Sequence, residues 1–156
     1  MSLRMLLPLK GAEELEAQLT LALDLAVTSV SEVGVLHVTP VEFFGRARFS
    51  LETPAEASYQ VESAVFELRM AGIGAQGHVR RAWVDRVGQE ISLDAAAWAP
   101  DVMVLGPPRR GPRTHRTGEG ISGRLERISP CPVLVAPAGG SLIGWENPLF
   151  APRLLS

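Results

Sequence analysis

The hydrophobic residues of the chain follow two patterns that alternate along its length. Short apolar segments predict five strands, at residues 4–9, 33–38, 76–84, 102–105 and 133–135. Between them, apolar residues recur every three or four positions, which predicts helices at residues 13–30, 55–71, 87–98 and 121–128. Strands that alternate with helices form parallel crossover units. The sequence therefore predicts an α/β fold, an open doubly wound five-stranded parallel sheet flanked by about four helices.

The second connection, residues 39–54, follows neither pattern clearly. It carries Phe43, Phe44 and Phe49, and a long connection in a compact domain is either a lid or a packed loop. We expect these three rings to pack as a satellite of the core, with a lid as the alternative. His37 lies inside the preceding apolar strand, so we expect it to be a packed structural histidine.

The chain divides into one domain, residues 1–138, and a C-terminal extension, residues 139–156. A chain of 156 residues buries roughly 70% of its unfolded surface and needs no metal or disulfide to fold. The extension is interrupted by Pro148 and Pro152, which makes it too irregular for a long helix. Its large apolar residues are Trp145, Leu149, Phe150, Leu154 and Leu155. We expect it to dock on its own sheet edge or on a dimer partner.

Composition excludes several classes of function. Cys131 is the only cysteine, which excludes an internal disulfide and a multi-cysteine zinc site and fits a reducing compartment. The apolar runs are far shorter than the roughly 18 residues of a membrane span, and the N-terminus is too short for a secretory signal. The net charge of −2 gives no general attraction to nucleic acid or anionic membranes. We therefore expect a cytoplasmic protein that binds neither nucleic acid nor membrane.

In a doubly wound sheet, the ligand crevice lies beyond the carboxyl ends of the strands, where the winding direction reverses. Here that crevice would be bounded by Lys10 and Gly11, by Val38 and Thr39, and by the loop that starts at Gly106. The start of the last helix faces the same space, and its free backbone N–H groups can bind an anion.

Four segments at these positions carry a family resemblance. MLLPLKG at the first strand, VLHV in the second, DVMVLG in the fourth and SPCPVLVAP at the fifth resemble the universal stress protein family, over about residues 3–137. The resemblance implies strand order 3-2-1-4-5 and, commonly, homodimers that pair through the last strand; many members bind ATP and others do not. The partners we expect are a second copy of the chain, held through the last strand and the tail, and a further protein.

The ATP-binding members carry a Gly, two residues, a second Gly, nine residues, and then a Gly followed by Ser or Thr. In this sequence the first glycine is Gly106, but the second falls on Arg109, the third on Glu119 and the Ser/Thr on Gly120. An acidic residue that contacts adenosine in those members falls on Lys10. The remaining candidate residues of the crevice are Pro8, Val38, Leu105, Arg110, Ile121 and Ser122.

These replacements change the chemistry of the crevice. Glycines let backbone N–H groups approach a phosphate, whereas Pro107 and Pro108 remove two donors and stiffen the loop. Glu119 places a carboxylate at the positive end of the last helix, where it can satisfy the free N–H groups and repel a phosphate. Lys10 could pair with Glu119 across the crevice. We hypothesise an internal plug, in which a carboxylate of the protein takes the place of a ligand phosphate and no cofactor is bound.

The loop that follows the fourth strand allows a second interpretation. Its cationic or titratable residues are Arg109, Arg110, Arg113, His115 and Arg116. Guanidinium groups suit phosphate well, so the loop could hold ATP or another nucleotide through side chains; the alternative is a solvated arginine loop. The first case describes a nucleotide-responsive switch, and the second a regulatory or protective module without a ligand.

The sequence offers no catalytic centre. Ser122 has no nearby base and no Gly-x-Ser-x-Gly motif surrounds it, so it is not an evident nucleophile. The three histidines have no metal-ligand spacing. We therefore expect a protein that is not an enzyme and holds no metal, with weak hydrolysis of a bound nucleotide as the alternative.

Overall fold

The computed structural model describes residues 3–9, 12–28, 30–50, 52–107 and 121–137. Its elements are β1 (Leu3–Leu9), α1 (Ala12–Thr28), β2 (Val30–Phe44), β3 (Ala47–Ser50), α2 (Pro54–Met70), β4 (Gly74–Trp83), the 3₁₀ helix η1 (Val84–Arg86), α3 (Val87–Trp98), β5 (Val102–Leu105), α5 (Ile121–Ile128) and β6 (Val133–Val135). The C-terminal extension lies outside the described residues.

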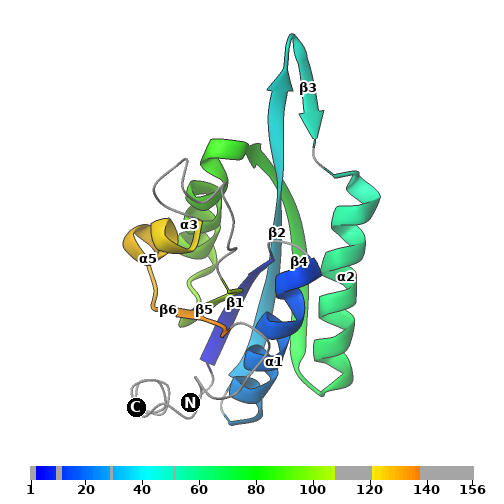
Figure 1. Ribbon diagram of the computed structural model, residues 1–156. Coiled ribbons are helices and arrows are strands. Elements are labelled where there is room, and N and C mark those ends of the chain that lie inside the picture. The colour runs from blue at the N-terminus through cyan, green and yellow to red at the C-terminus, as the bar shows by residue number, and fades with distance from the viewer. Residues whose placement is uncertain (1–2, 10–11, 29, 51, 108–120, 138–156) are drawn as a thin grey trace.

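Five of the strands run parallel in the order β4-β2-β1-β5-β6 (Figure 1). Counted along the chain, this is the order 3-2-1-4-5 that the family resemblance implies, and the doubly wound α/β fold is confirmed. The described residues contain a sixth strand, β3, which pairs antiparallel with the end of β2 and makes the sheet mixed. The sequence analysis missed this strand.

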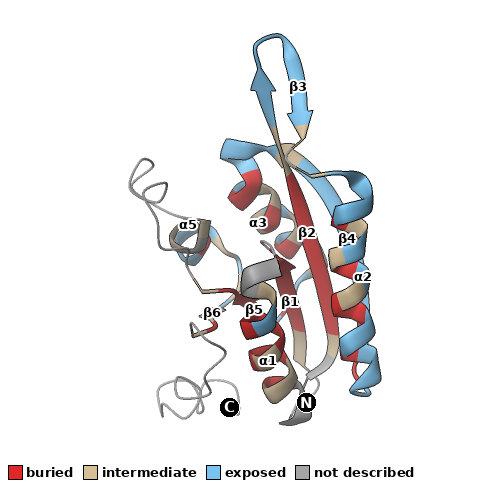
Figure 2. Cartoon of the chain, turned by 45° about the vertical axis from the view of Figure 1, so that its right-hand side comes forward, coloured by how far each residue is buried: buried red, intermediate tan, exposed pale blue. Residues whose placement is uncertain are grey.

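Helices cover both faces of the sheet, and β1, β5 and the part of β2 within the body of the molecule are buried between them, whereas β4 at the edge is mostly exposed (Figure 2). Successive residues of a strand point to opposite faces. Leu7 therefore packs in the core beneath α1 and α2, while its neighbour Leu6 packs beneath α3 and α5. Likewise, Val104 of β5 packs beneath α1 and α2, and Leu105 packs beneath α3 and α5. None of the helices in the described ranges has the length and apolar character needed to cross a membrane.

The end of β2 leaves the body of the molecule and forms a hairpin with β3 (Figure 1). Phe43, Phe44 and Phe49 are 61%, 84% and 56% exposed on this hairpin. The expectation that they pack against the core is therefore wrong. The antiparallel ladder satisfies the backbone of residues 41–50 without a loop returning to the core, so their rings are carried away from it.

Helix α2 has clear signals at both of its ends. The Thr53 hydroxyl accepts a hydrogen bond from the backbone N–H of Glu56 at 3.1 Å, and Pro54 occupies the first turn. After the helix, Gly72 adopts a φ of 83°, a left-handed conformation that glycine tolerates. These signals fix α2 along β4, at the edge of the sheet.

Helix α2 approaches β4 most closely at Gly77. A Cβ at this position would lie 2.2 Å from Cγ1 of Val61 and 3.2 Å from Cγ2 of Val65. Because valine is stiff at χ1, neither methyl group can turn away without a shift of the helix. The glycine therefore sets the spacing between the helix and the strand.

We expect Gly77→Ala to lower the free energy of unfolding by roughly 1–3 kcal/mol through overpacking. Adding Val61→Ala removes the clashing methyl group, so the two effects should couple by about 1 kcal/mol in a double-mutant cycle. Urea denaturation of the wild type, both single variants and the double variant measures this coupling. Simple additivity would contradict the close contact.

Candidate functional site

The apolar residues predicted to form the floor of the crevice lie at the carboxyl ends of the central strands. Val38 and Leu105 are buried in the cluster beneath α3 and α5, and Ile121 at the start of α5 packs against the same cluster. Pro8 is buried and pairs in register with Leu36, another member of that cluster, so it faces the same side of the sheet. The structure therefore brings these positions together on one face.

The phosphate side of the predicted crevice is described only in part. Gly106 is buried at the end of β5, and Pro107 follows it, half-buried. Ser122 lies in the first turn of α5, where only its backbone is described. The other predicted residues lie outside the described residues: Lys10, Arg109, Arg110, Glu119 and Gly120.

The ladder between β1 and β5 ends where the crevice begins. These strands pair only at Met5 with Val102 and at Leu6 with Met103. In this parallel register, the next hydrogen bond would run from the N–H of residue 8 to the carbonyl of Val104. Residue 8 is proline and has no N–H, so this bond cannot form.

The side chain of Gln18 replaces the missing donor. Its amide Nε2 donates to the carbonyl oxygen of Val104 at 3.0 Å and also to that of Pro8. Gln18 extends from α1 and its side chain is fully buried. The amide therefore joins two strands whose own ladder has stopped.

Sequence reasoning missed Gln18, although a signal for it was available. It is a polar residue next to Leu19 on the helix face that packs against the sheet, where an unpaired amide would cost free energy. Its Oε1 atom is buried and has no hydrogen-bond partner among the described residues.

A second polar cluster lies at the end of β2 on the α1 and α2 face of the sheet, opposite the predicted crevice floor. The Nδ1 atom of His37 bonds the carbonyl oxygen of Leu9 at 3.0 Å, and its Nε2 atom bonds Oε1 of Glu52. The Thr39 hydroxyl donates to the same Oε1 atom at 2.8 Å, and the Gln60 amide donates to Oε2 at 3.2 Å. His37 is buried with both ring nitrogens bonded, as expected of a structural histidine.

This hydrogen-bond pattern fixes where a proton lies. Nδ1 of His37 must donate, because the carbonyl of Leu9 can only accept. The cluster ties the segment that follows β3 to the sheet and to α2, and it closes that face of the strand ends.

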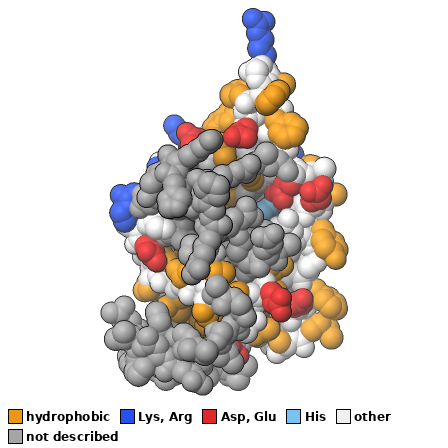
Figure 3. All heavy atoms as spheres, viewed as in Figure 1, with side chains coloured by type: hydrophobic (Ala, Val, Ile, Leu, Met, Phe, Trp, Pro, Cys, Tyr) orange, Lys and Arg blue, Asp and Glu red, His pale blue; other side chains and the backbone are white. Residues whose placement is uncertain are grey.

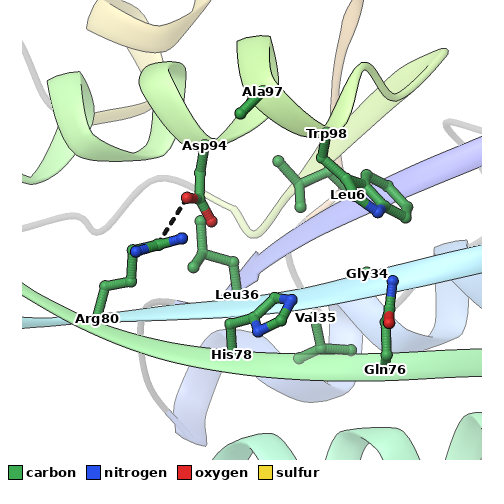
Figure 4. Close-up of a pocket in the computed structure, with 10 residues that line it drawn as sticks. All are labelled: Leu6, Gly34, Val35, Leu36, Gln76, His78, Arg80, Asp94, Ala97 and Trp98. Carbon is green, nitrogen blue, oxygen red and sulfur yellow. Dashed lines mark ion pairs between the residues drawn. The ribbon is translucent and has the colours of Figure 1, made fainter.

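A pocket of about 190 Å³ lies between β4 and α3, on the crevice side of the sheet but away from the strand ends (Figure 4). Arg80 and Asp94 form an ion pair at 2.6 Å at one end of it, and Trp98 lies at the other (Figure 4). A Cβ at Gly34 would come within 3.2 Å of the Trp98 ring, so the glycine admits this ring. The volume falls below the roughly 300–1,000 Å³ of typical ligand pockets.

The remaining chemistry of the described residues is limited. Burial raises the pKa of the Cys131 thiol above its usual value, which keeps it protonated and weakly nucleophilic at neutral pH. Within the described ranges, no group of three or more His, Cys, Asp or Glu side chains could hold a metal ion.

Comparison with known proteins identifies relatives of the chain. The model of the family described as "Universal stress protein family" matches residues 1–137. No protein with a curated description matches the chain.

Solved structures share the fold. The structure of a universal stress protein from Archaeoglobus fulgidus superposes with a TM-score of 0.66 at 21% identity, over 88% of this chain and 100% of that chain. The universal stress protein from Archaeoglobus fulgidus in complex with dAMP gives 0.63 at 20% identity, over 86% and 98%. A universal stress protein family protein from Arabidopsis thaliana with AMP bound gives 0.62 at 14% identity, over 88% and 97%.

The Gln18 bridge predicts a specific energetic coupling. Gln18→Leu keeps most of the side-chain volume but leaves two buried carbonyl groups without a donor, so we expect the free energy of unfolding to fall by roughly 1–3 kcal/mol. Pro8→Ala restores a backbone N–H that can bond Val104, so the cost of Gln18→Leu should be smaller in the Pro8→Ala background. Chemical denaturation of the four chains in the cycle measures this difference.

Glu16→Leu, at an exposed position of α1, serves as the matched control. An equal cost of Gln18→Leu in both backgrounds would refute the replacement of the missing donor.

Proposed function

The chain belongs to the universal stress protein family, and we propose that it is a regulatory or protective module of this family that does not bind ATP in the usual way. The observation that carries the proposal is that the predicted floor positions are apolar and buried, while the sequence of the phosphate side departs from the ATP-binding pattern. The floor is apolar and buried at Pro8, Val38 and Leu105. Only the first glycine of the ATP-binding pattern, Gly106, is present in the sequence.

The phosphate side argues against backbone binding of a triphosphate. Pro107 directly follows Gly106 and has no N–H to donate. The later glycine positions are Arg109 and Glu119, whose side chains prevent the close approach that glycines allow. In the proposed plug, the Glu119 carboxylate takes the place of a phosphate and Lys10 compensates its charge. No catalytic step is part of the proposal.

A nucleotide-responsive switch is the second candidate. Its support is the retained apolar floor, together with the neighbours of the same fold whose structures contain dAMP and AMP. A monophosphate needs fewer N–H donors than a triphosphate, and guanidinium groups such as those of Arg109 and Arg110 could supply them.

We also propose that the chain is cytoplasmic and forms a homodimer through β6 and the C-terminal tail. The support for the dimer is the position of β6 at one edge of the sheet, with Val133, Leu134 and Val135 only half-buried. An apolar edge strand is a ready surface for pairing with a second chain. The lone thiol of Cys131 fits a reducing compartment.

Calorimetric titration tests the plug directly. We expect no heat of ATP binding with the wild type, and binding in the micromolar range with Lys10→Asp/Arg109→Gly/Glu119→Gly/Gly120→Ser, because these changes restore the acidic contact and the glycine pattern. The same variant without Lys10→Asp is the matched control and should bind more weakly. Micromolar binding of ATP by the wild type would contradict the proposal. A folded variant that ignores ATP would show that the plug is not the reason for the lost binding.

A further inference from the structure

The hairpin carries an aromatic and basic surface on the α2 side of the sheet. Phe43 pairs with Arg48 across the hairpin, and Val41, which shares the face of Phe43, pairs with Trp83 of β4. The rings of Phe43 and Trp83 stack with their centroids 4.7 Å apart, and the Arg48 guanidinium lies 5.9 Å from the Trp83 centroid. Arg81 lies two residues before Trp83 and therefore on the same face. We call Phe43, Arg48, Arg81 and Trp83 the hairpin face.

This surface lies next to α2. Gly77 and Trp83 are six residues apart on β4 and point to the same side, and Gly77 packs against Val61 and Val65 of α2. The hairpin face therefore lies on the same side of the sheet as α2, just beyond the part that the helix covers.

The outward side of α2 carries the complementary chemistry. Tyr59, Phe66 and Met70 are 72%, 63% and 72% exposed. At 100° per residue they fall within about 40° of one another, opposite the buried side of the helix. Exposed carboxylates of Glu56, Glu62 and Glu67 flank this apolar line. We call these six residues the α2 stripe. A surface helix ordinarily turns polar residues to water, so two large apolar rings and a methionine in one line indicate a binding surface.

The charges of the two surfaces have opposite signs. Among the described residues, neither Arg48 nor Arg81 forms an ion pair, whereas Arg80 on the other face of β4 pairs with Asp94. The hairpin face is therefore basic and the α2 stripe acidic. Figure 3 shows hydrophobic side chains on the projecting hairpin, with Lys or Arg at its tip, and hydrophobic with acidic side chains down one side of the body.

A two-stranded hairpin alone is marginally stable in water, because it exposes its rings and lacks a packed face. A partner that covers the rings and supplies carboxylates would stabilise it. The α2 stripe has both properties, and every copy of the chain carries one hairpin face and one α2 stripe on the same side of the sheet.

We propose that two copies of the chain associate by mutual exchange, with the hairpin face of each copy packed on the α2 stripe of the other about a two-fold axis. In such a closed arrangement, the hairpin face and the α2 stripe of both copies are covered at the same time. It lies at the β4 edge of the sheet, at the far edge from β6. It is therefore a different contact from a dimer through β6 and does not depend on the nucleotide crevice.

Charge reversal tests the exchange with two variants. The first, Arg48→Glu/Arg81→Glu, makes the hairpin face acidic; the second, Glu62→Arg/Glu67→Arg, makes the α2 stripe basic. Each variant alone would place like charges opposite one another in both contacts. We expect its self-association to weaken roughly tenfold or more. In an equimolar mixture, every contact again joins opposite charges.

The measurement is mass in solution by analytical ultracentrifugation over a range of protein concentrations. We expect the wild type to have at least twice the mass of either variant, and the mixture to return to the wild-type mass. If copies also pair through β6, each such dimer offers two exchange contacts, so the wild-type mass can then exceed twice that of the variants. Arg86→Glu/Glu126→Arg reverses two exposed charges elsewhere and should keep the wild-type mass.

Because all four target side chains are exposed, we expect the circular dichroism of the variants to match the wild type. Should one unfold, Arg48→Gln/Arg81→Gln and Glu62→Gln/Glu67→Gln replace the pair, with weakened association of each expected.

Two results would overturn the proposal. One is a wild-type mass no greater than that of the charge-reversed variants, and the other is a mixture that fails to regain the wild-type mass. Binding of a fluorescent single-stranded oligonucleotide to a wild type that does not self-associate, lost in Arg48→Glu/Arg81→Glu, would assign the hairpin face to nucleic acid instead.

Discussion

The absence of a backbone N–H at Pro8 is the constraint on which the rest of the site depends. It stops the ladder between β1 and β5 after Leu6 and Met103, at the point where the sheet reverses its winding direction. The Gln18 amide then holds the two strands through the carbonyl groups of Pro8 and Val104. The junction of β1 and β5 at the place of the predicted crevice is thus set by one proline ring in the backbone and one buried side chain.

At the carboxyl ends of the strands, the two faces of the sheet differ in chemistry. On the α1 and α2 side, Glu52 joins His37, Thr39 and Gln60 in one hydrogen-bonded cluster, which seals that side. On the α3 and α5 side, the predicted floor positions are apolar and buried. The same cluster anchors the chain just after the hairpin, so the hairpin departs from a fixed base and its rings lie at a defined place beside α2.

Much of this arrangement could be predicted from the sequence. Parallel strands covered on both faces have a strong hydrophobic signature, and the floor positions Pro8, Val38 and Leu105 followed from the family resemblance. The hairpin could not be predicted, because adjacent Phe43 and Phe44 break the alternation of a half-buried strand and their burial depends on a partner. Gln18 and Glu52 were also missed. Gln18 could have been found as a polar residue on the apolar face of its helix, whereas Glu52 acts through groups that periodicity does not detect.

The most direct test of the account is to purify the protein without added nucleotide, denature it, and identify the released small molecules by mass spectrometry. If the apolar floor is retained while the phosphate side is closed by the protein's own side chains, no nucleotide is released. A stoichiometric amount of AMP, ATP or another nucleotide would contradict this closure and would show that arginine side chains have replaced the glycine cradle.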